Sequence, residues 1–441
     1  MSSVYPIASG SLKILKLAFH LSSGINCQSV PRNYKWSVVG MLWCISLFNY
    51  ADRQAVFSVF PLLEKELQLS TVQLGLLGSA FAWVYGACAP FAGMLVDRIS
   101  RTKAILFGLH AWSAICVATG IAKTFPQLFF FRAAEGLGET FYYPASMSML
   151  SDYHGRETRS RAMGIHQTSV YMGTVAGGFF AGWIGQVYGW RWSFYVFGGL
   201  GILLGIILHR FLIEPERGAS EEVSAAQAET LSYPAFLRIL FTTPTALLLM
   251  VAFVCMNFVA VVLLAWMPKF LYDKFHLGLA SAGLIATIFA QGGSMIGSPT
   301  GGWLADVMRL RLAGGRMLVQ CVAAICAAPF VFLCGNTGEL NFAIGALAFW
   351  GFFKGFYDAN IWASLFDVVP MKARGRAVGL MNMVGWIGGG TAPLVIGYLA
   401  QTWGLGGAIA SAGFVYIVGA AVLLAATFGF AARDIARVSS R

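Results

Sequence analysis

Long apolar stretches restrict what this chain can fold into. Of its 441 residues, 58% are hydrophobic and 11% are charged, and the mean hydropathy is +0.70. A soluble protein of this size cannot bury so many apolar side chains in a core, so lipid must surround them. A membrane span needs about 20 apolar residues, and such stretches can be centred near residues 36–60, 72–95, 103–122, 127–150, 162–186, 191–212, 244–268, 280–305, 316–334, 340–366, 376–400 and 405–430.

These twelve stretches are typical of helices. No window shows the regular ten-residue alternation of a barrel strand, and the abundant Gly, Ala and Leu suit closely packed helices. A segment from about 214 to 232 is rich in Glu, Ala and Ser and marks the one clear drop in hydropathy. We therefore expect an all-α membrane protein with twelve transmembrane helices in two six-helix bundles. The predicted parts are an N-terminal tail (1–35), a first bundle (36–213), a linker (214–243), a second bundle (244–430) and a C-terminal tail (431–441).

The chain contains two copies of one pattern. Arg-Ser-Arg-Ala-Met-Gly-Ile at 159–165 recurs 215 residues later as Arg-Gly-Arg-Ala-Val-Gly-Leu at 374–380. The same shift carries Asp152 to Asp367, Gly182 to Gly397 and Gly189 to Gly404. Two similar halves that rock about a shared centre are how many secondary transporters expose one site to alternate sides of a membrane.

Basic residues gather on one side of the predicted helices. With the N-terminus in the cytoplasm, the tails and the loops on that side hold most of the 30 Lys and Arg residues. The opposite loops receive Lys65, Lys123, Arg191, Lys269 and Lys274. Cytoplasmic loops carry such an excess, so both termini are predicted to be cytoplasmic. The net charge of +11 is spread over loops that face anionic lipid, which argues against a nucleic acid partner.

The sequence does not support several other classes of protein. The eight cysteines have no Cys-x-x-Cys spacing and mostly fall in apolar stretches, so we interpret them as packing residues. No Gly-x-Ser-x-Gly turn, phosphate-binding loop or metal-ligand spacing is present, so the sequence predicts neither an enzyme nor a cofactor or metal site. The apolar run at 14–21 lacks a following cleavage site and predicts a surface segment or disorder instead of a signal peptide.

A loop after the second predicted helix carries a recognisable motif. It reads Gly-Met-Leu-Val-Asp-Arg-Ile-Ser-Arg-Thr-Lys at 93–103, and Gly-Trp-Leu-Ala-Asp at 302–306 repeats it in weaker form. Together with twelve spans and the duplication, it resembles the loop signature of the major facilitator superfamily over residues 36–430. There the glycine allows close helix approach, and the motif latches one conformation without touching substrate. The resemblance thus implies gating by Gly93, Asp97, Arg98, Arg101 and Asp306.

Charged residues inside the predicted spans indicate a central site. A charge at a helix centre costs about 2.5–3.5 kcal/mol or more unless it faces water or a partner. The first helix has Asp52 and Arg53, and the tenth has the i, i+4 pair Lys354 and Asp358. On the fourth helix, Arg132, Glu135 and Glu139 share one face, which we expect to turn inward. Lys354 is the repeat partner of Glu139, so the two could confront each other across the pseudo-symmetry axis. Internal salt bridges that only neutralise one another are the alternative.

One branch of the superfamily matches these positions. Asn-Tyr-Ala-Asp-Arg at 49–53, Arg-x6-Glu at 132–139 and Tyr-Pro at 143–144 resemble the anion:cation symporter family, which moves organic anions with protons. The resemblance implies Asp52 and Glu139 as proton carriers, Arg53 or Arg132 as the anion ligand, and Tyr50 and Tyr85 as hydrogen-bonding partners. A guanidinium matches a carboxylate bidentately, which agrees with these roles.

The chain departs from that branch in two helices. Where the eleventh helix of the branch often has Gly-Asn-x-Gly-Gly, residues 385–389 read Gly-Trp-Ile-Gly-Gly. Trp386, with His166 and Gln167 on the fifth helix, could reshape the pocket toward a bulkier anion, or could be packed and satisfied in the core. Asn382 and Asn360 could bind substrate or form interhelical hydrogen bonds.

Two alternatives to anion symport remain open. The spinster-like branch, which carries lipid-related molecules, shares the first-helix Asn-Tyr-x-Asp-Arg and the fourth-helix Arg-x6-Glu. A non-transporting membrane receptor would use the buried charges for structure alone. Our prediction is a monomeric, multi-pass protein of the plasma (inner) membrane. Its predicted partners are a small-molecule anionic substrate, protons and membrane lipid.

Overall fold

Helices make up the fold. The structure, a computed structural model, describes residues 34–96, 98–155, 157–215 and 232–439, and these ranges contain no strand. The predicted surface segment at 14–21 lies outside them. The first half consists of α2 (Tyr34–Ser58), α3 (Phe60–Leu67), α4 (Thr71–Val96), α5 (Arg101–Ile121), α6 (Phe125–Glu139), α7 (Tyr142–Tyr153), α8 (Arg159–Tyr188) and α9 (Trp190–Phe211).

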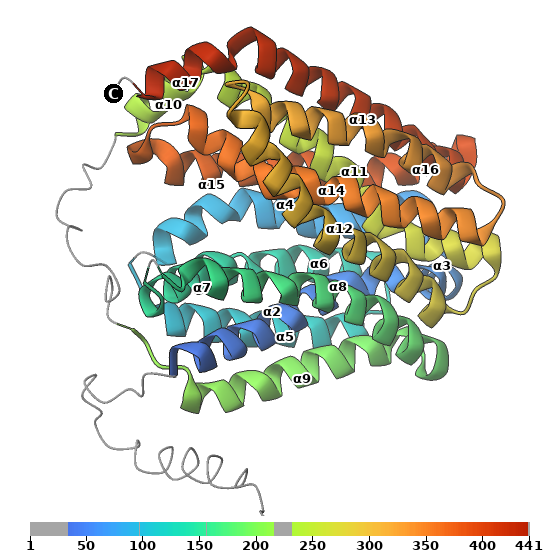
Figure 1. The fold of residues 1–441 in the computed structure, drawn as a ribbon. Helices are drawn as coiled ribbons and strands as arrows, with labels where there is room; N and C mark the ends of the chain where they lie inside the picture. Colours follow the sequence, from blue (N-terminus) through green and yellow to red (C-terminus); the bar gives the residue numbers. More distant parts are fainter. Residues whose placement is uncertain (1–33, 97, 156, 216–231, 440–441) are drawn as a thin grey trace, which may run out of the picture.

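The second half has longer helices. It consists of α10 (Tyr233–Phe241), α11 (Pro244–Phe275), α12 (Leu279–Arg309), α13 (Gly315–Asn336), α14 (Leu340–Val368), the 3-10 turn η3 (Met371–Ala373), α15 (Arg374–Gly390), α16 (Ala392–Ala425), the π-helical turn η4 (Ala426–Phe430) and α17 (Ala431–Ser439). Short helices α10 and α17 lie together at one end of the molecule (Figure 1).

Seven helical stretches in the described ranges are long and apolar enough to cross a membrane by length and composition. Helices α2, α6, α8 and α14 are not among them. These are the helices on which the sequence places buried charges and polar residues, and α6 is also short. Their polar character therefore marks them as helices that line a site between the apolar ones.

Two predicted spans are each broken in the middle. The span at 127–150 becomes α6 and α7, and the span at 376–400 becomes α15 and the start of α16. Pro144 lies in the first turn of α7 and Pro393 in the first turn of α16. Proline lacks an N–H and is tolerated in a first helical turn, so each proline starts a new helix and stops the previous one.

The duplication is visible in the backbone. Gly189 and its repeat partner Gly404 both adopt a positive φ, 92° and 69°, where the chain turns back into the next span. The last two predicted spans meet at Gly404, within α16. Glycine has no Cβ and adopts this region without strain. The same turn is therefore built at corresponding positions of the two halves.

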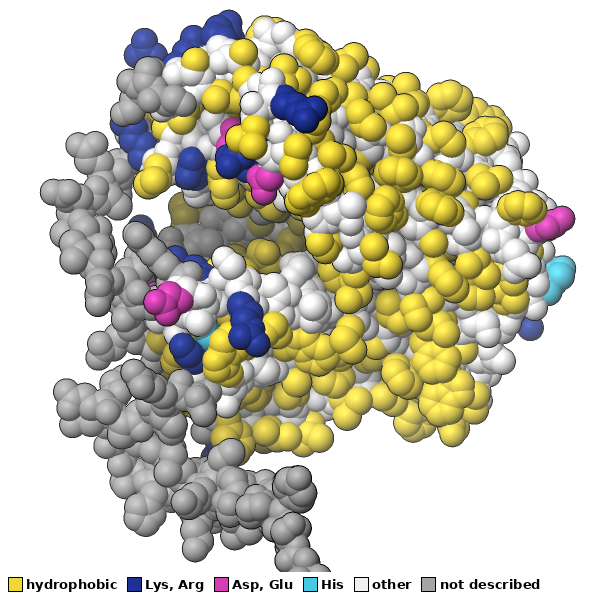
Figure 2. Space-filling view, viewed as in Figure 1, with side chains coloured by type: hydrophobic (Ala, Val, Ile, Leu, Met, Phe, Trp, Pro, Cys, Tyr) yellow, Lys and Arg dark blue, Asp and Glu magenta, His cyan; other side chains and the backbone are white. Residues whose placement is uncertain are grey.

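The halves meet mainly along three helix pairs. Helix α8 packs on α12, and α4 packs on α15 and α16. A Cβ added at Gly178 on α8 would lie 2.6 Å from the carbonyl oxygen of Gly283 on α12, so glycine allows these backbones to touch. Figure 2 shows a hollow between the halves at the edge where Lys and Arg gather, which we name the basic end. The molecule is thus open at the basic end and closed at the opposite end.

Candidate functional site

Five charged residues from two helices form a buried cluster in the first half. Arg53 on α2 forms an ion pair with Glu139 on α6, and its Nε donates a hydrogen bond to that carboxylate. Arg132 forms an ion pair with Glu135 one turn along α6. All are buried, with Arg53 the most exposed at 9%. Arg132, Glu135 and Glu139 therefore share an inward face of α6, as expected, and the two guanidiniums pair with different carboxylates.

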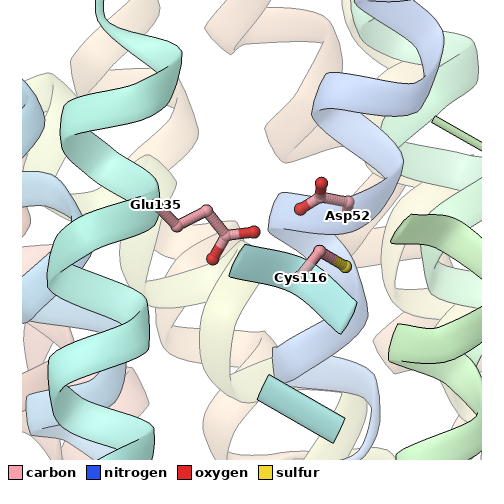
Figure 3. Close-up of side chains that lie close together, drawn as sticks. All are labelled: Asp52, Cys116 and Glu135. Carbon is pink, nitrogen blue, oxygen red and sulfur yellow. The ribbon is translucent and has the colours of Figure 1, made fainter. Parts of the chain in front are cut away.

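Asp52 is the fifth member, and it forms no ion pair with a Lys or Arg side chain of the described residues, whereas the other four members pair with one another. A carboxylate oxygen of Asp52, one of Glu135 and the thiol of Cys116 on α5 lie within 4.8 Å of one another (Figure 3). The Oδ1 atom of Asp52 is buried and has no hydrogen-bond partner in the described structure. Because the cluster holds three carboxyl groups and two guanidiniums, it carries one excess negative charge when all are ionised. These three helices meet only in the fold, so sequence spacing did not predict this grouping.

Arg53 lies in an aromatic box. Its guanidinium carbon is 4.7 Å from the ring centroids of Tyr50 and Tyr85, 4.9 Å from that of Phe81 and 5.7 Å from that of Trp386. Trp386 comes from α15 in the second half, and its ring lies 5.1 Å from that of Tyr85. Such rings attract a cation and exclude water from it. Arg53 is thereby held at the boundary between the halves, with its Nη1 atom buried and without a partner in the described residues.

A second polar group lies in the other half. Lys354 and Asp358 on α14 form an ion pair beside a cavity of about 80 Å³. The expected encounter of Lys354 with Glu139 is wrong, because Glu139 pairs with Arg53 and Lys354 pairs within its own helix. The cavity is lined by Phe253, Met256, Asn257, Ala260, Lys354, Tyr357, Asp358 and Tyr416. The sequence could have indicated Asn257 as a cavity residue, because it is a polar residue in an apolar stretch. Nothing in the sequence except their positions in helices indicated Tyr357 and Tyr416.

Two further predicted substrate residues already have partners in the protein. His166 is buried, and its Nε2 contacts the hydroxyl of Tyr142 at 2.9 Å, whereas its Nδ1 is buried without a partner among the described residues, so only one ring nitrogen matches the packed alternative. Asn360 donates from its amide to the carbonyl oxygens of Gly301 and Phe356, which matches interhelical hydrogen bonding. Gln167 and Asn382 are half-buried.

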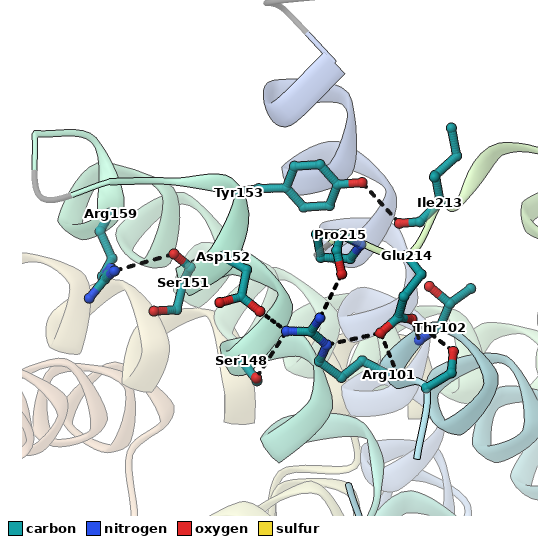
Figure 4. A network of polar contacts seen from close by, with 11 residues as sticks. Arg101, Thr102, Ser148, Ser151, Asp152, Tyr153, Arg159, Ile213, Glu214 and Pro215 are labelled. Atoms are coloured by element: carbon teal, nitrogen blue, oxygen red, sulfur yellow. Dashed lines mark hydrogen bonds and ion pairs between the residues drawn. The ribbon is translucent and has the colours of Figure 1, made fainter. Parts of the chain in front are cut away.

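The motif residues at the basic end hold each half together internally. Arg101, at the start of α5, forms an ion pair with Asp152 on α7 and contacts Glu214 at 3.0 Å (Figure 4). Its repeat partner Arg316 binds Asp367 at 2.8 Å and Asp306 at 2.9 Å. The Arg-Asp pairs 101–152 and 316–367 are related by the 215-residue shift. None of these contacts crosses between the halves in this open conformation.

The remaining residues of the loop motif make fewer contacts in this conformation. The expected close approach at Gly93 is wrong in this conformation, because a Cβ added there would meet nothing within 4 Å. Arg98 is exposed, and Asp97 lies outside the described residues. The halves are spread apart at the basic end, so no neighbouring helix reaches Gly93.

Glu214 fastens the start of the linker to α5. Its carboxylate accepts hydrogen bonds from the backbone N–H groups of Arg101 at 3.0 Å and Thr102 at 2.7 Å, and from the Ser100 hydroxyl at 2.8 Å. Burial alone raises the pKa of this carboxyl, but these hydrogen bonds outweigh it and lower the pKa to about 2. The carboxylate also faces the positive end of the helix.

An ion pair at the end opposite the basic end joins the two halves. Lys269 on α11 pairs with Glu64 on α3 and lies 2.7 Å from Asp273. The sequence had placed Lys269 in an outer loop, and this is wrong: α11 continues to Phe275, and Lys269 is 5% exposed. Gln54 on α2 also donates to the carbonyl oxygen of Leu264 at 2.9 Å. These contacts hold that end closed.

Two similar helical halves around a charged centre, with apolar helices on the outside, define an integral multi-pass membrane protein. The family model of the Major Facilitator Superfamily matches residues 42–393 and 270–437. The chain belongs to this superfamily, as the sequence had indicated.

Relatives and solved structures of known proteins agree with that membership. The chain is 28% identical over 400 residues to the "Probable galactarate/D-glucarate transporter GudP" of Bacillus subtilis (strain 168), covering 84% of this chain and 86% of that one. It is 24% identical to the "D-galactonate transporter" of Escherichia coli O6:H1, covering 92% and 98%. In fold it is similar to a bacterial homolog of the human lysosomal transporter Spinster in an inward-facing and unoccupied conformation, with a TM-score of 0.81, 21% identity and coverage of 92% and 99%.

Proposed function

We propose that this protein is a secondary active transporter that moves a sugar acid by proton symport with alternating access. The observation that carries the proposal is Arg53, a buried guanidinium at the boundary between the halves with one donor, Nη1, left unpaired. A ligand carboxylate supplies the acceptor that this donor lacks. Relatives are named as transporters of galactarate, glucarate and galactonate, all of which carry a carboxylate.

Coupling follows from competition for Arg53. Glu139 occupies the guanidinium when no substrate is bound. A proton on Glu139 would neutralise it and release Arg53 for the substrate carboxylate, so proton and anion would enter together. Asp52 would take a second proton once the substrate is bound, because the substrate carboxylate restores the excess negative charge that protonation of Glu139 had removed, and such a charge is costly in this buried cluster. Arg132 is the weaker candidate for the anion ligand, because it is paired with Glu135 and only 1% exposed.

The basic end is assigned to the cytoplasm. Loops rich in Lys and Arg remain on that side of a membrane, and the hollow in Figure 2 would then open inward. Both termini lie on the cytoplasmic side in this assignment, the membrane is the plasma (inner) membrane, and the protein acts as a monomer.

Lipid-related cargo is the second candidate, and one observation favours it. A crevice of about 440 Å³ lies between α8 and α12, where the halves meet, and its lining is mainly apolar, including Met172, Phe179, Phe180, Ile288 and Met295. An amphipathic molecule could enter there from the bilayer. Stabilisation of the purified protein against heat by lysolipids, and not by sugar acids, would favour this candidate.

Uptake into proteoliposomes tests the proposed function directly. With labelled D-galactonate outside and an inward proton gradient, we expect accumulation above the equilibrium level, abolished when the gradient is dissipated. An equal Na⁺ gradient without a proton gradient serves as the control for the coupling ion. A receptor would show no accumulation under any gradient, and accumulation driven by Na⁺ alone would contradict the proton symport.

A further inference from the structure

The cavity beside Lys354 has the features of a built binding site. The hydroxyl of Tyr357 is buried and lacks a hydrogen-bond partner in the part of the chain that the structure describes, and Tyr357 is 4% exposed. Tyr416 accepts a hydrogen bond from Trp350 Nε1 at 3.0 Å, so its own O–H proton remains available to donate. Buried polar groups are normally paired, and each exception needs an explanation. A ligand in the cavity would provide one.

The donors and acceptors of the cavity are electrically balanced. The ammonium of Lys354 is matched by the carboxylate of Asp358, and both residues line the same cavity as Tyr357 and Tyr416. The cavity therefore offers donors and an acceptor together with no net charge. That set suits alcohol groups, because a hydroxyl both donates and accepts. A carboxylate would face Asp358 as a like charge.

The cavity and the aromatic box adjoin through α15. Asn257, which lines the cavity, donates a hydrogen bond to the carbonyl oxygen of Gly385 at 2.8 Å, and the ring centroid of the next residue, Trp386, lies 5.7 Å from the guanidinium carbon of Arg53. The cavity is about 80 Å³, enough for several water-sized groups. Phe253, Met256 and Ala260 line it with apolar surface, which suits the carbon chain of a polyol.

From this arrangement we infer that the transporter selects sugar acids with one carboxylate and a hydroxyl-bearing far end over acids with a carboxylate at both ends. The single carboxylate binds at Arg53 in the first half, and the hydroxyl end binds Lys354, Tyr357 and Asp358 in the second. Asp358 is the residue that rejects a second carboxylate. This inference rests on the proposed function and names its substrate class. A ligand that contacts both halves in this way is also suited to draw them together during transport.

Competition in counterflow exchange tests the inference. The full-length protein in liposomes exchanges labelled D-galactonate, and unlabelled D-galactonate and galactarate compete. The two acids differ at one end, where D-galactonate has CH₂OH and galactarate has a second carboxylate. We expect D-galactonate to compete about tenfold or more better, because a second carboxylate at the far end meets the like charge of Asp358. In Asp358→Asn the ratio falls to about one or inverts. Glu339→Gln, which changes an exposed acid at the start of the same helix, α14, is the matched control and keeps the wild-type ratio.

Outcomes separate the inference from the proposed function. Better competition by galactarate in the wild type, or an unchanged ratio in Asp358→Asn, overturns the inference and leaves sugar acid transport standing. Exchange of neither acid overturns both. If thermal unfolding shows that Asp358→Asn does not fold, Tyr357→Phe is tested instead. In that variant we expect the affinity for D-galactonate to fall about threefold to tenfold, and the affinity for galactarate to change little. Equal losses for both acids in that variant also overturn it.

Discussion

At the scale of residues, the pairing inside the charged centre decides which guanidinium a substrate can reach. Asp52, Arg53, Arg132 and Glu139 lie inside apolar helices, where a charge is costly and rarely without purpose. The choice of partner depends on how α2 and α6 face each other, which no spacing along one helix encodes. Arg132 pairs with Glu135, three residues along the same helix, and Glu139 pairs with Arg53.

Arg53 is the residue whose change should affect anion binding most. In Arg53→Lys the charge remains, but the planar donors are lost, so we expect affinity for D-galactonate to fall about tenfold or more, or ~1.4 kcal/mol. Substrate-induced thermal stabilisation of the purified protein measures this. Arg132→Lys is the matched control, expected to lower the melting temperature while leaving affinity within about threefold. The reverse pattern would assign the anion to Arg132.

Glu139 should separate coupling from binding. In Glu139→Gln the side chain stays neutral, and Arg53 is no longer held by a carboxylate, so substrate can bind without a proton. We expect proton-driven accumulation to be lost while counterflow exchange partly continues. Both are measured in the same liposomes. Accumulation with unchanged pH dependence would remove Glu139 from the coupling mechanism.

At the scale of helices, the apolar stretches predicted where most elements lie and the prolines explain where they differ. Single spans became α6 with α7 and α15 with α16 because Pro144 and Pro393 begin new helices. Hydropathy averages over about 20 residues and cannot detect such breaks. The contact between Glu214 and α5 was equally hidden, because it depends on how the chain turns after α9.

The linker contact at Glu214 should make stability depend on pH. The pKa of Glu214 is about 2 in the folded protein, below the ordinary value of about 4.3. Its contribution is therefore complete above about pH 4.3 and is lost as the pH falls toward 2. We expect Glu214→Gln to have a lower melting temperature than the wild type at pH 6, with the difference shrinking below pH 4. A difference that is constant from pH 6 to pH 3 would contradict this role. Asp306→Asn, at an exposed pair, should change the melting temperature less.

At the scale of the whole molecule, the duplication predicted two halves, and the structure shows what joins and separates them. Repeated pairs at Arg101 and Arg316 stabilise each half separately, whereas Lys269 and Glu64 connect the halves at the end opposite the basic end. The sequence did not suggest this connection, because Lys269 appeared to lie in a loop. Alternating access requires such a contact to break whenever the closed end opens.

Breaking the Lys269 contact should therefore shift the molecule toward the conformation open at that end. Lys269 is almost fully buried and keeps Asp273 as a partner in Glu64→Gln, so loss of the half-exposed Glu64 carboxylate costs about 1 kcal/mol, which corresponds to a shift of about fivefold in a two-state equilibrium. Spin labels on α3 and α11 would report longer distances in Glu64→Gln. Glu66→Gln is the matched control, because Glu66 pairs with Arg191 inside the first half and should leave the distances unchanged. If both variants kept the wild-type distances, the closed end would be held by the glycine contact of α8 with α12 instead, since that contact needs no charge.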